Sequence, residues 1–147
     1  MPPKQFKFRL ETVLELRKKK EEQEQEKYLK LVDEVARMDR QIEEVRSEQH
    51  RIYRECAEKM ADGVELNEWR REMGYANYLN EVAGRLVVHR GELEKARLCQ
   101  RDVLIEATKK KKVLESLKGK AFQDFIFETN LQEQRELDDW ASTHFRP

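Results

Sequence analysis

The chain has 147 residues, of which 41% are charged and 38% hydrophobic, whereas ordinary domains hold about 25% and 45–50%. Thirty basic side chains balance thirty acidic ones, so the formal net charge is zero and the long-range field that gathers nucleic acid or anionic lipid is missing. Composition therefore excludes a thick globular core and argues against nonspecific binding to polyanions.

The chain start, Met-Pro-Pro-Lys-Gln-Phe-Lys, lacks the apolar core of a signal peptide. No apolar run approaches the roughly 20 residues that span a bilayer. We therefore expect a soluble, cytoplasmic protein.

No proline occurs between Lys4 and Arg146, and the strongest turn signal inside that stretch is Asp62-Gly63. Proline breaks helices, so its absence permits two very long ones. We predict an all-α fold, a long antiparallel two-helix coiled-coil hairpin whose second helix is longer than the first. The expected bounds within one elongated domain, 1–147, are helix one at about 8–60, the turn at about 61–66 and helix two at about 67–140.

Apolar residues in the first predicted helix alternate three and four apart, which is the pattern of a coiled-coil seam. Gln49 interrupts this seam, and between Arg17 and Lys27 the seam positions are polar. The expected seam residues are Leu10, Leu14, Tyr28, Leu31, Val35, Met38, Ile42, Val45, Ile52 and Cys56.

The second predicted helix carries a seven-residue repeat that only Gln100 breaks. Gly119 is the expected position of a kink, and a third helix folding back from there is an alternative. The repeat consists of Leu79, Leu86, Leu93, Gln100, Ala107, Leu114 and Ala121.

If the bend lies near residue 63, residues that face each other have numbers summing to about 127. Val45 then faces the Val82 region and Tyr28 the Cys99 region. The same arithmetic places the acidic residues 21–24 near the basic run 109–112. At the open end, Phe6 and Phe8 would pack beside Ala121, Phe122 and Phe125, and helix two would overhang the hairpin beyond residue 126.

Motifs for catalysis are missing from the sequence, which has no phosphate-binding glycine loop, no Cys-x-x-Cys, no His-Glu-x-x-His and no Gly-x-Ser-x-Gly. The three histidines are far apart. Cys56 lies near the bend and Cys99 far along helix two, so we expect reduced thiols and no intrachain disulfide. We predict no enzymatic activity, no cofactor, no metal and no small-molecule substrate.

The run Lys109 to Lys112 lacks interleaved aromatic residues and has acidic neighbours, so a solvated or acid-paired face is favoured over a nucleic-acid site. A surplus of apolar residues near the middle of the chain suggests either extra packing or a partner surface. This surplus comprises Tyr53, Trp69, Met73, Tyr75, Tyr78, Leu79, Val82, Leu86, Val87 and Val88.

Several strings resemble the FliJ family, soluble components of the flagellar type III export apparatus. The resemblance covers nearly the whole chain and includes the central turn. The strings are Phe6-Lys-Phe-Arg-Leu-Glu-Thr-Val-Leu-Glu-Leu-Arg17, Leu93-Glu-Lys-Ala-Arg97, Glu106-Ala-Thr-Lys-Lys-Lys-Lys-Val-Leu-Glu115 and Glu136-Leu-Asp-Asp-Trp-Ala141.

The resemblance implies a non-enzymatic protein of flagellar assembly, protein export and motility, located in the cytoplasm and peripherally at the inner face of the cell membrane at the flagellar base. Its implied partners are the export ATPase ring, the membrane protein of the export gate and the chaperones of export substrates. We expect a monomer when the chain is alone. The alternative is a generic coiled-coil scaffold or dimerisation protein with no link to export.

Two groups of residues follow from the resemblance as candidate contact sites. The ring-facing end would include the overhang from Lys118 to Trp140 together with Phe6, Phe8, Arg9, Arg17, Phe122, Phe125 and Ile126. The gate or chaperone surface would include Gln41, Val45, Ile52, Tyr75, Leu79 and Val82.

Overall fold

A computed structural model describes residues 4–145 and contains two helices, α1 (Glu11–Asp62) and α2 (Leu66–His144). No strand occurs in that described range. The prediction of an all-α fold with a longer second helix is confirmed. α2 runs through Gly119 without interruption, so the alternative of a third helix folding back there is wrong.

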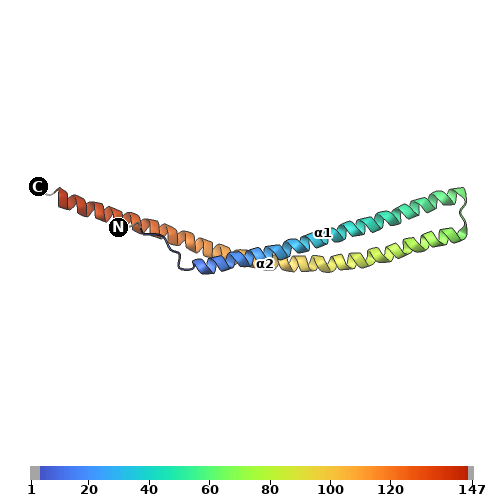
Figure 1. Cartoon of the computed structure of the whole chain (residues 1–147), viewed down its shortest axis with the longest axis horizontal. Helices are drawn as coiled ribbons and strands as arrows, with labels where there is room; N and C mark the ends of the chain where they lie inside the picture. The colour runs from blue at the N-terminus through green and yellow to red at the C-terminus, as the bar shows by residue number, and fades with distance from the viewer. Residues whose placement is uncertain (1–3, 146–147) are drawn as a thin grey trace. The chain divides into compact units, whose positions relative to one another are not determined.

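The chain divides into two compact units. Unit 1 comprises residues 1–24 and 104–147, and unit 2 comprises residues 25–103. In unit 2, α1 and α2 lie side by side and the turn joins them (Figure 1). Each unit therefore combines a segment of α1 with an antiparallel segment of α2.

The turn depends on one glycine. Gly63 directly follows α1 and has a φ of 86°, a left-handed conformation that glycine adopts without a steric penalty and that commonly ends helices. On the α2 side of the turn, the Trp69 amide donates to the Glu65 carbonyl at 3.1 Å. The Lys59 ammonium lies 2.8 Å from a Glu72 carboxylate oxygen and links the two helices beside the turn.

The core of unit 2 is a narrow stripe of small and medium side chains. Ile52 and Cys56 of α1 pack with Ala76 and Leu79 of α2, and Val45 packs against this cluster. Ala76 is fully buried, and its small side chain lets the two backbones approach closely. Val45 thus lies beside the α2 segment that contains Ala76 and Leu79, which agrees with its predicted position facing the Val82 region.

Gln49 is the polar residue inside this stripe. Its side-chain amide donates to the Ala76 carbonyl and to the Tyr53 hydroxyl, each at 3.3 Å. Its oxygen accepts from the Arg46 guanidinium at 3.2 Å, which also donates to Asn80 at 3.0 Å. A buried polar group costs free energy unless it is hydrogen-bonded, so this network favours the one register in which Gln49 meets Ala76.

Unit 1 follows the same antiparallel register with fewer apolar contacts. Leu14 is almost fully buried, and Ala107 is buried too. The Lys111 ammonium lies 2.8 Å from a Glu21 carboxylate oxygen, so the predicted match of the acidic segment to the basic run is confirmed. A second interhelical ion pair joins Lys118 to Glu11 at 2.8 Å.

Replacing Ala76 by Leu should lower the free energy of unfolding by about 1–3 kcal/mol, because the larger side chain has no space in the closed stripe. Thermal unfolding followed by circular dichroism measures the effect. The matched control is Ala96→Leu on the exposed surface of the same helix, which should change the value by less than about 0.5 kcal/mol. Equal effects of the two substitutions would contradict the proposed seam.

Candidate functional site

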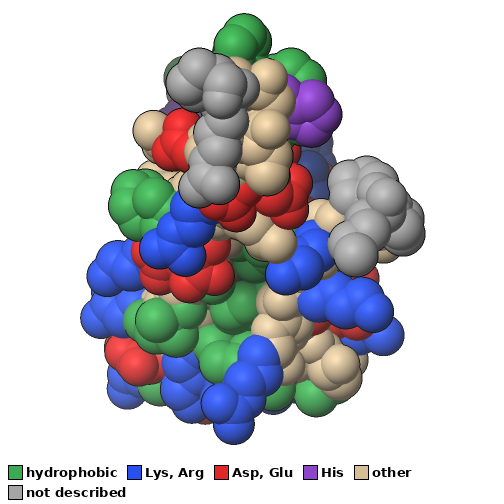
Figure 2. Space-filling view, turned by 90° about the vertical axis from the view of Figure 1, so that its left-hand side faces the viewer, with side chains coloured by type: hydrophobic (Ala, Val, Ile, Leu, Met, Phe, Trp, Pro, Cys, Tyr) green, Lys and Arg blue, Asp and Glu red, His purple; other side chains and the backbone are tan. Residues whose placement is uncertain are grey.

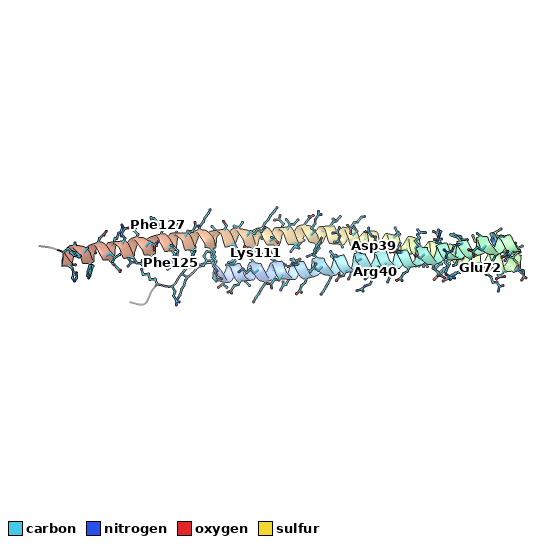
Figure 3. The ribbon with its side chains drawn as sticks, turned by 90° about the horizontal axis from the view of Figure 1, so that it is seen from above. Asp39, Arg40, Glu72, Lys111, Phe125 and Phe127 are labelled. Atoms are coloured by element: carbon cyan, nitrogen blue, oxygen red, sulfur yellow. The ribbon has the colours of Figure 1, made fainter. Side chains whose placement is uncertain are left out.

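An aromatic cluster in unit 1 joins the N-terminal segment to α2. The Phe6 ring lies 5.2 Å from the Phe122 ring in an edge-to-face arrangement and 5.5 Å from the Phe125 ring. Such geometry is favoured by the ring quadrupoles. Phe125 lies on the side of α2 that faces the N-terminal segment, whereas Phe127 points to the opposite side (Figure 3). The predicted packing of Phe6 beside Phe122 and Phe125 is confirmed.

The N-terminal segment, residues 4–10, is not helical. The Glu11 amide donates to the Phe8 carbonyl at 3.2 Å, and α1 begins there. Before that point the alternation of apolar and polar residues allows Phe6 and Phe8 to turn toward α2. Phe8 and Arg9 line a hollow that Ala121 and Phe125 of α2 also line.

The other residues expected at this end differ in accessibility. Arg17 is half-buried on α1, and Ile126 is exposed on α2. Hydrophobic side chains are visible among the Lys and Arg side chains in the space-filling view (Figure 2). All seven residues expected to face the ring belong to unit 1. Three of them, Phe6, Phe122 and Phe125, form one aromatic cluster.

Beyond this cluster, α2 continues as a helix with little cover. Every residue from Leu131 to Trp140 is exposed. At its end, the Trp140 and His144 rings stack with centroids 4.5 Å apart, and the Thr143 hydroxyl donates to the Asp139 carbonyl at 2.7 Å. The segment is thus helical to its end while presenting Leu137 and Trp140 to solvent.

The residues expected at the gate or chaperone surface lie in unit 2 and fall into three groups. Ile52 and Leu79 belong to the buried stripe. Gln41, Val45 and Val82 are half-buried. Tyr75 is exposed and stacks on Tyr78 with ring centroids 6.3 Å apart.

The ion pair between α1 and α2 in unit 1 shifts the pKa values of its two members, Glu21 and Lys111. Hydrogen bonding to Lys111 lowers the pKa of Glu21, and the same contact raises the pKa of Lys111. Thr108 and Lys112 lower the pKa of Glu21 further, against the opposing effect of burial. The ionised pair is therefore favoured at neutral pH.

Comparison with known families identifies the chain. Residues 6–147 match the model of a family described as Flagellar FliJ protein. The chain belongs to the FliJ family. No curated protein and no solved structure matches it. Membership implies a role connected with flagellar export, in a family of structural export components that is not a known family of enzymes.

In this FliJ-family chain the two thiols are free, with Cys56 buried and Cys99 exposed. The Cys56 thiol donates to a Glu72 carboxylate oxygen at 2.8 Å, and this hydrogen bond, together with burial, raises the pKa of the thiol. Among residues 4–145, no group of His, Cys, Asp and Glu side chains is arranged to hold a metal ion. Neither helix, over the same residues, combines the length and apolarity needed to cross a membrane.

The sequence of this FliJ-family chain predicted the charge match of residues 21–24 with residues 109–112, but not the interhelical polar contacts of Gln49 and Glu72. It identified Gln49 only as an interruption of the seam, and it assigned no role to Asn80 or Glu72. The only available signal was a polar residue at a seam position, which does not name the partner atom. The hydrogen bond from Gln49 to a backbone carbonyl depends on the register and could not be read from residue types.

The Glu21–Lys111 pair predicts a pH-dependent contribution to stability. Because the pKa of Glu21 is lowered in the folded state, the contribution is complete above the ordinary glutamate value of 4.5 and is lost as the pH falls through the lowered value. Glu21→Gln should therefore reduce the thermal unfolding temperature at pH 7, and the difference from the unsubstituted chain should shrink at about pH 3. Circular dichroism checks this.

Glu22→Gln on the neighbouring exposed position is the matched control for that experiment. Like Glu21→Gln, it removes one negative charge, but it leaves the 2.8 Å contact between Lys111 and Glu21 in place. A Glu21 effect that is the same at both pH values, or that Glu22→Gln reproduces, would contradict a stabilising role for the ion pair.

Proposed function

We propose that the chain is a non-enzymatic component of flagellar type III export that docks on the export ATPase ring and links it to the export gate and to substrate chaperones. Family membership supports an export role. The docking contacts are our proposal and rest on the exposure pattern of the two units. The proposed location is the cytoplasm, at the inner face of the cell membrane at the flagellar base.

The observation that carries the docking proposal is the uncovered helical end of α2. Ten consecutive residues, Leu131 to Trp140, are exposed, and they include Leu137 at 68% and Trp140 at 54% exposure. Exposed apolar side chains that form a contiguous patch mark a surface that meets a partner. Next to them, Phe122 and Ile126 offer apolar contacts on an element already ordered as a helix, so docking costs little conformational entropy.

The proposed surface for the gate and chaperones lies in unit 2, where Tyr75 and Tyr78 form a stacked, exposed pair. Tyrosine is enriched at interfaces because its ring packs while its hydroxyl remains hydrogen-bonded. Ile52 and Leu79 support this surface from the buried stripe and do not contact a partner directly. Gln41, Val45 and Val82 form its half-buried margin in our proposal.

The proposed mechanism is coupling without catalysis. One part of the chain binds the ring and another binds the gate or a chaperone. The chain thereby links nucleotide turnover in the ATPase to opening of the gate. The alternative, a generic coiled-coil scaffold, would use the exposed apolar residues of unit 2, such as Val87 and Val88, and would not bind the ATPase.

Binding to the export ATPase tests the proposal. The double substitution Phe122→Ala and Ile126→Ala should weaken co-purification with the ATPase at least about tenfold, because truncating central apolar contacts of an interface typically costs more than about 1.4 kcal/mol. The unsubstituted chain should also change the ATPase rate, and the double variant should do so less.

The matched control is Val87→Ala with Val88→Ala, which removes two exposed apolar side chains from unit 2. It should leave ATPase binding unchanged. If the unsubstituted chain forms no complex with the ATPase and does not alter its rate, the scaffold alternative is favoured and the docking proposal fails.

Tyr75→Ala combined with Tyr78→Ala tests the second surface. We expect reduced flagellar export in a complementation assay, measured as secreted filament protein, with unchanged binding to the export ATPase. Leu66→Ala, another exposed apolar position of α2, serves as the control. Normal secretion by the tyrosine variant would remove this pair from the proposed gate surface.

A further inference from the structure

The α2 segment of unit 1 has opposite charges on the two sides of a short neutral stretch. Between residues 109 and 120 lie six lysines and one glutamate, and between residues 124 and 139 lie six acidic residues and one arginine. Residues 121–123 are uncharged. A second copy of α2 running antiparallel, centred here, would place the basic half of each chain against the acidic half of the other. This is the self-complementarity that a two-fold symmetric interface needs.

An exposed stripe on α2 has the same centre as this charge pattern. Gly119, Phe122 and Ile126 are spaced three and four residues apart, so they share one face of the helix. Lys112 precedes Gly119 by seven residues and Glu133 follows Ile126 by seven, so they continue the same face in both directions. Phe122 is 46% and Ile126 43% exposed, and in the described part of unit 1 neither Lys112 nor Glu133 takes part in a salt bridge.

Gly119 has no role that the single chain explains. Glycine inside a helix costs up to about 1 kcal/mol relative to alanine, and a Cβ atom added here would meet nothing within 4 Å. Its φ is not positive, so the backbone does not require glycine. Gly119 borders a hollow whose other lining residues are Phe6, Leu14, Lys18, Glu115, Lys118 and Phe122. A glycine in such a place allows another molecule to approach the helix backbone closely.

We infer that two copies of this chain associate through the stripe as an antiparallel, two-fold symmetric dimer. Ile126 of each copy enters the hollow over Gly119 of the other, and Lys112 of each copy faces Glu133 of the other. The apolar contacts lie at the centre of the interface and the ion pairs at its margins, which is the usual anatomy of a protein interface. This inference differs from the sequence-based expectation that the chain alone is a monomer, and the molecular mass in solution decides between the two.

The dimer is a property of the purified chain and does not rest on the proposed function. It does cover Phe122 and Ile126, which we assign to ATPase docking. Pairing and docking therefore exclude each other, and the dimer is a form in which the apolar stripe is protected from solvent until the ATPase is available.

Sedimentation equilibrium of the purified chain tests the inference, at concentrations from about 1 to 100 µM and at about 0.05 and 0.5 M salt. We expect a monomer–dimer equilibrium that shifts toward monomer at high salt. A single monomeric mass at every concentration would overturn the inference, as would a larger open-ended assembly.

A charge swap tests the pairing of specific residues. Lys112→Glu alone and Glu133→Lys alone should each raise the dimer dissociation constant about three- to tenfold, because each substitution creates two like-charge contacts per dimer. Combining both substitutions in one chain restores opposite charges at both symmetric positions, so the dissociation constant should return to within about twofold of the original. A double variant as weak as the single ones would overturn the assigned register.

Gly119→Ala separates the dimer from the stability of the single chain. The substitution should raise the thermal unfolding temperature of the monomer, since alanine favours the helix, while weakening the dimer at least about tenfold by filling the site of Ile126. Gly84→Ala also meets nothing within 4 Å and should raise stability without affecting the dimer. Equal dimerisation of the two variants would contradict the role of Gly119.

Discussion

The narrow contact between two helices is the constraint on which the rest of this structure depends. A pair of helices can bury only one stripe on each partner, and here that stripe contains few large side chains. Leu14 is the largest side chain that is almost fully buried, while Ala76 and Ala83 are fully buried because the backbones meet closely at small residues. Stability is therefore spread over many modest contacts, and most of the chain's surface remains available for binding.

In a seam with so little apolar area, polar groups reinforce the register that the turn sets. In unit 2 the Gln49 amide reaches the Ala76 carbonyl, and in unit 1 the ion pair of Glu21 and Lys111 fixes the two helices against each other. A shift by one turn would leave each of these groups desolvated and unpaired, which costs more than the contacts themselves contribute. Polar residues at seam positions thus specify one alignment of an otherwise repetitive structure.

The same narrow contact leaves room on the helices for the several partners that we propose. Because α2 extends beyond its contacts with α1, its end presents Leu137 and Trp140 on an ordered helix. The stripe of Phe122 and Ile126 is offered both to the proposed ATPase contact and to a second copy of the chain. Because both would use one surface, the ATPase and a second copy would compete for it. The fraction of the chain in the dimer would then fall when the ATPase is present, and no catalytic group would be needed.

The sequence by itself determined the two long helices, the turn at Gly63 and the seam, because these depend on proline placement, backbone freedom and a local apolar period. It also predicted the facing of Glu21 with Lys111 and of Phe6 with Phe122, since one turn position fixes all pairings of an antiparallel pair. Only the tertiary structure decided which atom Gln49 bonds, that Ile52 and Leu79 are buried while Tyr75 is exposed, and that a hollow lies beside Gly119. Those features depend on the rotation and separation of the helices, which residue spacing leaves undetermined.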